Sequence, residues 1–246
     1  MATPAAIAAF FLVALIYGAV GFGGGSSYTA LLTLTDLQPG MIPPVSLVCN
    51  LLVVTGSAVH FHRRGYFLPA LAGPFLLGSV PCALIGGVWP LRQDVFLGVL
   101  GLALVLAGTA ILVRRCESDP GPPPGRSVAV AAGAGLGLLS GLVGIGGGVF
   151  LAPLMLWRRW GTAKQVAATC AFFILANSLA GLAGQWLKLR TLAPLASHWP
   201  LFIAVVAGGQ LGSLLGSGPL PQPAVRRLTA VLVLVAGLRV LWKLAG

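Results

Sequence analysis

Charged side chains are scarce in this sequence. Only 8% of its 246 residues are Asp, Glu, Lys or Arg, whereas soluble domains carry about 25%. Hydrophobic residues make up 57%, and apolar runs long enough to cross a hydrocarbon core of about 30 Å recur along the whole chain. The composition therefore excludes a soluble globular domain and predicts a multi-pass protein embedded in the lipid bilayer.

Acidic residues are the rarest of the charged types. The four carboxylates, Asp36, Asp94, Glu117 and Asp119, all lie at the ends of apolar segments or in a central linker, so a carboxylate proton relay inside the membrane is not expected. The 15 Lys and Arg residues gather in short connections such as Arg63-Arg64 and Arg158-Arg159. Such positions are typical of positive-inside topology signals, and they do not indicate nucleic-acid binding.

The sequence also lacks patterns for metals, cofactors and catalysis. Its four cysteines, Cys49, Cys82, Cys116 and Cys170, show neither CxxC nor zinc spacing and are expected to be free thiols. Its glycine-rich segments lack the lysine of a P-loop and the third glycine of a dinucleotide fingerprint. We expect no cofactor, no metal and no enzymatic activity, because no acid, base or metal cluster converges.

A series of apolar segments fills the chain instead. Between breaking residues they span roughly 4 to 34, 41 to 61, 68 to 88, 94 to 114, 127 to 157, 163 to 187, 195 to 216 and 223 to 244. They are apolar on every face, unlike the alternating strands of membrane barrels, so each is expected to be helical. The predicted fold class is an all-α integral membrane protein with about eight helical segments.

A hydrophilic linker, residues 116–126, separates a first membrane repeat, residues 1–115, from a second, residues 127–246. The two halves are expected to be homologous because Gly18-Ala-Val-Gly-Phe-Gly-Gly-Gly25 and Gly141-Leu-Val-Gly-Ile-Gly-Gly-Gly148 match at an offset of 123. We call these segments the first and second glycine boxes. The same offset pairs Ser46 with Thr169, whereas a four-residue gap pairs Asn50 with Asn177, and the sequence leaves both registers open.

The first and fifth segments are too long for one straight crossing. About 31 helical residues would span about 46 Å, so each segment must tilt, break or turn back, and three consecutive glycines place the break at the box. If both segments turn back as hairpins, ten Lys and Arg lie on one side and five on the other; full crossings give nine and six. The charge bias slightly favours the hairpins, and the repeat is then inverted.

A helix that starts after a break directs free N–H groups and a positive dipole end into the protein, which favours an anion. The predicted binding site combines the boxes with the nearby hydroxyls and amides: Gly23, Gly24, Gly25, Ser26, Ser46, Asn50, Gly146, Gly147, Gly148, Thr169, Asn177 and Ser178. No buried Lys or Arg is expected at the boxes, so the backbone must supply most of the attraction. The competing interpretations are that the boxes only pack helices and that the hydroxyls only tie helices together.

The run from Gly141 to Leu154, followed by Ala167-Ala-Thr-Cys-Ala-Phe-Phe-Ile-Leu-Ala-Asn177-Ser, resembles the TauE/SafE sulfite exporter family, whose second half has a GIGGG box, a nearby proline and a threonine-rich helix. The first half is similar but departs from the pattern at Ala30, where the family often has proline, and at Pro43-Pro44-Val-Ser46. The likeness covers nearly the whole chain. On that pattern, residues 23–25, residues 146–148 and Thr169 carry over as site residues.

The resemblance implies a permease of the bacterial inner membrane that moves sulfur-containing anions such as sulfite, sulfoacetate, other organosulfonates or thiosulfate. Export is the expected direction, since an inside-negative membrane drives anions outward without a coupling ion; sodium held by backbone carbonyls is left open. Two other functions compete: a non-transporting membrane assembly subunit, and a thiol-based sulfur relay through Cys49 and Cys170. The sequence also leaves open whether the protein forms a homo-oligomer.

Overall fold

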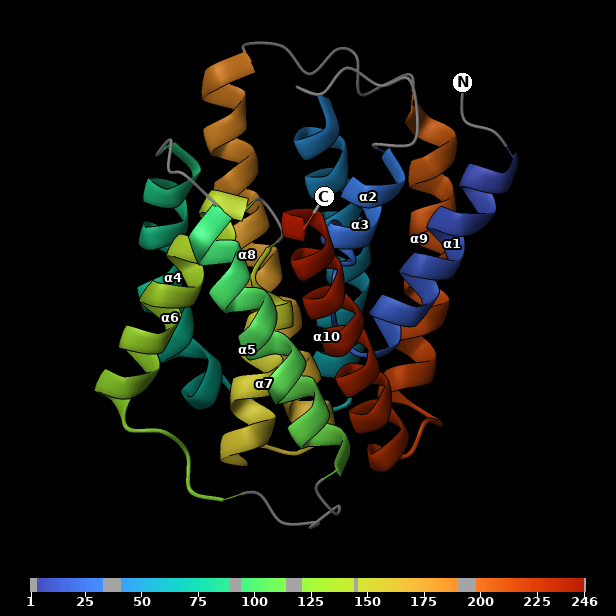
Figure 1. The fold of residues 1–246 in the computed structure, drawn as a ribbon. Coiled ribbons are helices and arrows are strands. Elements are labelled where there is room, and N and C mark those ends of the chain that lie inside the picture. The colour runs from blue at the N-terminus through green and yellow to red at the C-terminus, as the bar shows by residue number, and fades with distance from the viewer. Residues whose placement is uncertain are drawn as a thin grey trace.

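The computed structural model describes residues 4–32, 41–88, 94–113, 121–143, 146–189 and 198–245. Within these ranges it contains ten α-helices and no strand (Figure 1). The helices are α1 (Pro4–Ala19), α2 (Gly25–Leu32), α3 (Ile42–Arg63), α4 (Pro69–Val88), α5 (Asp94–Val113), α6 (Arg126–Val143), α7 (Gly148–Arg158), α8 (Ala163–Leu189), α9 (Trp199–Ser217) and α10 (Gln222–Ala245). The all-helical prediction is confirmed, and the predicted first and fifth segments each contain two helices.

Four helical stretches in the described residues are long and apolar enough to cross a membrane: Pro44–Arg63, Pro69–Gly86, Ala163–Ala183 and Trp199–Ser217. They belong to α3, α4, α8 and α9. Four further apolar stretches among the described residues are shorter and lie in α1, α5, α6 and α7. These lengths, together with apolar side chains exposed over much of the surface, fit a multi-pass bundle whose outer face contacts lipid.

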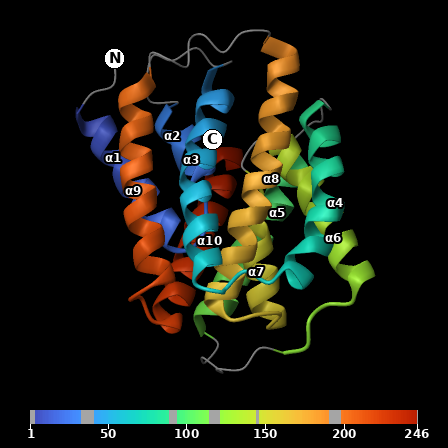
Figure 2. The ribbon, with the colours of Figure 1, turned by 180° about the vertical axis from the view of Figure 1, so that it is seen from behind.

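The helices pack mainly as pairs taken from distant parts of the sequence. α1 runs along α9, α4 along α6 and α5 along α10, while α3 contacts both α8 and α9 (Figure 2). Glycine allows the first pair to approach closely: a Cβ on Gly208, Gly212 or Gly216 would collide with backbone carbonyls of α1. Gly133 and Gly137 of α6 meet carbonyls of α4 in the same way. Small residues at such spacings are the usual means of close packing between membrane helices.

The first predicted segment turns back on itself. The Tyr28 ring on α2 stacks on the Phe10 ring of α1, with centroids 5.1 Å apart. A continuous helix would place these residues about 27 Å apart, at 1.5 Å per residue. Leu32 also shares a buried cluster with Phe10 and Leu201. The pair α1 and α2 is therefore a helical hairpin whose two ends lie at the end of the bundle that carries the N-terminus (Figure 1).

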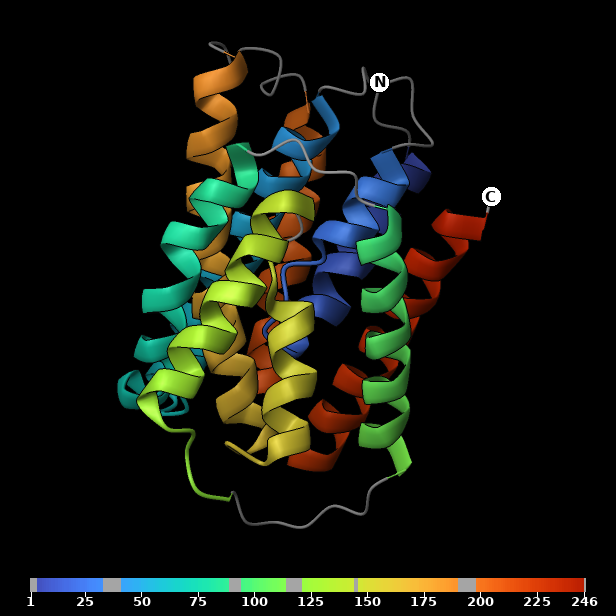
Figure 3. The same ribbon diagram turned by 60° about the vertical axis from the view of Figure 1, so that its left-hand side comes forward.

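The second long segment forms a similar hairpin from the opposite end of the bundle (Figure 3). The N–H of Gly121, just before α6, donates to the carbonyl of Arg159, just after α7, over 2.7 Å. The beginning of α6 and the end of α7 therefore lie together. Because α1–α2 and α6–α7 enter from opposite ends, their two breaks are brought toward the middle of the bundle.

One end of the bundle carries most of the described basic residues. Lys164, which is buried, donates through Nζ to the carbonyl of Gly218 over 2.9 Å and lies 5.3 Å from the centre of the Tyr66 ring. Arg64 also reaches Gly218, since its Nη2 lies 2.9 Å from an ideal Cβ there. The connections after α3, α7 and α9 thus meet at this end, which we call the basic end.

Candidate functional site

The two glycine boxes interrupt their helices with backbone that a side chain disfavours. Gly24, immediately before α2, has φ of +82°, and Gly147, immediately before α7, has φ of +76°. Most residues with a Cβ adopt such angles only with strain. The boxes therefore contain turns between half-helices. The first box also packs closely, since a Cβ on Gly18 or Gly21 would collide with the backbone carbonyl of Gly209 or Ala167.

Each break exposes the start of a helix to the middle of the protein. α2 begins at Gly25 and runs toward the N-terminal end; α7 begins at Gly148 and runs toward the basic end (Figures 1 and 3). The N-cap of α7 is Gly147, and no side chain caps it. The first N–H groups of a helix have no partner within the helix, and both helix dipoles present their positive ends at the breaks.

Asn50 on α3 contacts both boxes. A Cβ on Gly25 would lie 2.5 Å from Asn50 Nδ2, and a Cβ on Gly23 would collide with Asn50 Oδ1. A Cβ on Gly146, in the second box, would lie 3.3 Å from the same Nδ2. Asn50 is fully buried. The structure therefore brings the two boxes together around one amide.

α8 supplies the other predicted polar groups. Ser178 lies next to the second box, with Oγ 3.1 Å from an ideal Cβ on Gly146. Thr169 and Asn177 lie one turn before and one turn after Phe173, which touches Gly147. All three polar residues are at most 2% exposed, and within the described parts of the chain the Thr169 and Ser178 hydroxyls and both amide atoms of Asn177 have no hydrogen-bond partner.

Ser46, another predicted site residue, has a structural contact instead. Its hydroxyl accepts from Thr29 Oγ1 over 3.1 Å and donates to the carbonyl of Gly25 over 2.9 Å. These bonds fasten α3 to the first turn of α2. Ser46 therefore positions the break, and the side chain of Ser26, also in the predicted set, lies outside the described part of the structure.

The two halves do not contribute the same chemistry at the boxes. Ile174 meets Gly146 and Gly148 where Asn50 meets Gly23 and Gly25. Asn50 and Ile174 are 124 residues apart, one residue more than the offset of 123 that aligns the two boxes. Neither register considered from the sequence pairs them. An amide from α3 and an isoleucine from α8 thus occupy comparable places, and on the α8 side Ser178 is the polar group beside the second box.

Sequence reasoning missed a cation beside the first box. Arg239 of α10 donates from Nη1 to Ser27 Oγ over 3.2 Å, and the same Oγ lies 3.0 Å from the Tyr17 hydroxyl. The sequence predicted that no buried Lys or Arg serves the boxes, and Arg239 is itself exposed, but its guanidinium still reaches a buried hydroxyl beside the first box. A long side chain can reach several ångströms from its own helix, and the sequence does not show which helix α10 faces.

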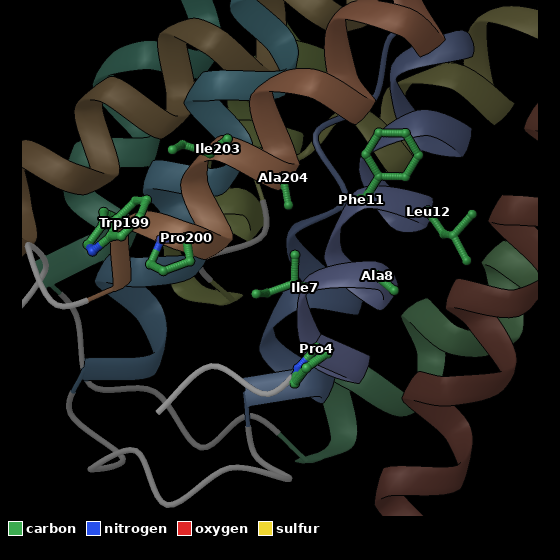
Figure 4. A pocket seen from close by; sticks show the side chains of 9 residues that line it. All are labelled: Pro4, Ile7, Ala8, Phe11, Leu12, Trp199, Pro200, Ile203 and Ala204. Atoms are coloured by element: carbon green, nitrogen blue, oxygen red, sulfur yellow. The ribbon is translucent and has the colours of Figure 1, made fainter.

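Neither the apolar groove between α1 and α9 nor the cysteines offer comparable chemistry. The groove is lined by Pro4, Ile7, Ala8, Phe11, Leu12, Trp199, Pro200, Ile203 and Ala204 (Figure 4). Such a wall suits lipid chains rather than an anion. Cys49 and Cys170 are buried and free, Cys82 is partly buried and free, and Cys116 lies outside the described residues. No group of three metal-ligating side chains occurs among the residues described.

The described helices, with their two opposed broken hairpins, are those of a multi-pass membrane protein. The family comparison agrees: a model described as "Sulfite exporter TauE/SafE" matches residues 6–240. The chain therefore belongs to the TauE/SafE family of membrane transporters, as the sequence resemblance predicted.

Two bacterial relatives carry matching descriptions. "Probable membrane transporter protein y4hK" of Sinorhizobium fredii is 38% identical over 240 residues, covering 95% of this chain and 96% of the relative. "Probable membrane transporter protein YunE" of Bacillus subtilis is 26% identical over 233 residues, covering 80% of this chain and 81% of the relative. No solved structure is similar to the chain at a significant level.

Proposed function

We propose that this transporter exports small sulfur-containing anions, such as sulfite, sulfoacetate or related organosulfonates, with thiosulfate as a further candidate. The observation that carries the proposal is the meeting of two helix starts around Asn50. Two positive dipole ends and their free N–H groups would bind the anion, as helix N-termini do in other anion sites.

The polar groups of α8 support a ligand at the same place. Burying a polar group without a hydrogen bond costs about 1–3 kcal/mol, so the Thr169, Asn177 and Ser178 side chains would each be stabilised by a polar ligand. The hydroxyls and the amide N–H are all donors that an oxyanion can accept from. The proposed site contains the glycines of both boxes, Asn50, Thr169, Asn177 and Ser178, with Ser46 holding the first break in place.

The substrate class comes from the family description, which names sulfite export. Export also follows from electrostatics. An inside-negative potential drives an anion outward by about 2.3 kcal/mol per charge per 100 mV. Transport in this direction needs no coupling ion, no cofactor and no chemical conversion of the substrate.

The distribution of charge supports an orientation in the membrane. Arg63, Arg64, Arg158, Arg159 and Lys164 lie at the basic end, which the positive-inside rule assigns to the cytoplasm. We place the protein in the bacterial inner membrane with its N-terminus outside. Residues 1–115 and 127–246 are then inverted repeats joined by the linker, an arrangement that opens a central site alternately to either side.

A flux screen in liposomes tests the proposal. Purified protein would be assayed with sulfite, sulfoacetate, taurine, thiosulfate and chloride, with protein-free liposomes and a Gly24→Leu/Gly147→Leu variant as controls. Flux of at least one sulfur-containing anion, lost in the double variant, is expected. If folded wild-type protein neither moves nor binds any of the sulfur compounds, the proposed function is wrong, and a stable partner protein would then favour the assembly-subunit alternative.

A further inference from the structure

Three separate segments converge on Ser27. Tyr17 belongs to the end of α1, Ser27 is the third residue of α2, and Arg239 comes from the last third of α10. Ser27 is 5% exposed, and its Oγ accepts from Arg239 and pairs with the Tyr17 hydroxyl. The guanidinium is thus held at one defined place on the first half-helix.

Arg239 itself is an exposed residue of α10, and its guanidinium reaches from there to the buried Ser27. Ser27 accepts from one of the five N–H groups of the guanidinium. The planar group can offer two parallel donors to an oxyanion, which is the geometry that sulfite and sulfonate groups accept.

The cation lies close to the proposed site. Ser27 follows Gly25 by two residues, which is about 3 Å along the helix axis, and Gly25 contacts Asn50. We propose that Arg239 is a substrate-binding residue that attracts the oxyanion to the first break and holds it there. This inference rests on the proposed anion site and adds a side-chain charge that the backbone alone does not provide.

Among the described residues, the second break has no hydroxyl at the position that corresponds to Ser27. The box offset of 123 carries Ser27 onto Phe150, which is buried in an apolar cluster with Leu151 and Met155. The contact between Arg239 and Ser27 therefore lies on the side of the first box, toward the end of the bundle opposite the basic end. On that side Arg239 would hold the anion at the last stage of export, before its release.

A guanidinium near a membrane surface can also extend to lipid phosphates without touching any substrate. The test must separate the two roles. Arg239→Gln removes the charge, Arg239→Lys keeps a charge without the planar fork, and Arg227→Gln is the matched control, since Arg227 is an exposed residue of the same helix at the basic end. Sulfite and sulfoacetate flux would be measured in liposomes over a range of concentrations.

We expect Arg239→Gln to raise the KM for the anion by about 10- to 100-fold, the range for a lost hydrogen bond to a charged group. Arg239→Lys should recover part of the loss, and Arg227→Gln should match the wild type. An unchanged KM in folded Arg239→Gln overturns the inference while leaving the proposed function intact. Wild-type protein that moves no anion counts against the proposed function itself, so the two failures are distinguishable.

A chemical rescue covers the case in which Arg239→Gln does not insert. Arg239→Cys in a background without other cysteines would be modified by a cationic or by a neutral methanethiosulfonate of similar size. Recovery of low KM with the cationic reagent alone supports binding through charge. Recovery with both reagents, or with neither, overturns the inference because bulk or backbone position would then explain the effect.

Discussion

Gly24 and Gly147 are the residues whose backbone most directly defines the two breaks. Replacing either with Leu forces a side chain into left-handed backbone, which costs about 1–3 kcal/mol, and places it where the half-helices begin. We expect each variant to insert but to lose transport by more than about tenfold, as 1.4 kcal/mol corresponds to a factor of ten. Flux per inserted molecule is the measurement.

Gly135→Leu is the matched control for these variants. Gly135 lies on α6, and a Cβ there meets nothing within 4 Å. The transport rate of the Gly135→Leu variant should therefore equal that of the wild type. Normal binding and flux in both box variants would mean that the boxes serve only as packing devices.

Thr169 and Asn177 allow a finer test of the site. Thr169→Val and Asn177→Leu each remove hydrogen-bonding groups that no other described residue uses. We expect anion affinity to fall by about 1–3 kcal/mol, with little loss of thermal stability, because no hydrogen bond within the described protein is broken. Thr109→Val, on an exposed helix face, should leave affinity unchanged. If all three variants bind the anion with wild-type affinity, the polar residues of α8 do not belong to the site.

Cysteine chemistry is expected to have no part in the function. Cys49 and Cys170 are buried among apolar side chains, and their surroundings differ between the two halves. A variant with Cys49, Cys82, Cys116 and Cys170 changed to Ala or Ser should insert, and its transport rate should lie within about twofold of the wild-type rate. Substitutions that nearly conserve side-chain volume in a core usually cost less than about 1.5 kcal/mol of stability. Loss of flux in a well-folded Cys49→Ser or Cys170→Ser protein would support the sulfur-relay alternative.

At the scale of single elements, the hairpins make a clear prediction about topology. The structure places the end of α3 and the end of α7 at the same end of the bundle. Single cysteines at Arg64 and Arg159, in the background without native cysteines, should therefore react with an impermeant reagent from the same side of the membrane. Labelling in intact cells and in inverted vesicles measures this. Reaction from opposite sides would contradict the hairpins and require full crossings.

The positions of the breaks followed from simple reasoning about length and glycine content, since about 31 apolar residues exceed the bilayer. The direction of the chain after each break did not. It depends on contacts such as the stacking of Tyr28 on Phe10, which join residues that the hydropathy pattern treats alike. The apolar pattern identifies a helix but not the neighbour against which it packs, because every face of such a helix is hydrophobic.

The same limit applies to the site across the whole molecule. The sequence singled out the glycines, Asn50 and Ser178 because polar or flexible residues are unusual at membrane depth. It could not show that Ile174 takes the place comparable to Asn50, since the two helices shift by one residue relative to the boxes. Nor could it find Arg239, because a basic residue near a segment end ordinarily indicates only topology.

The pairing of α1 with α9 has a consequence for how the protein is made. Gly208, Gly212 and Gly216 bring the two helices into contact, yet α1 ends at Ala19 and α9 begins only at Trp199. At about 5–20 residues per second, a ribosome needs about 10–40 s to make the intervening chain. During that time α1 has only lipid or other early helices beside it. The first half is therefore inserted in the membrane as an incomplete intermediate until α9 has been made. Insertion chaperones or quality-control proteases would act at this stage.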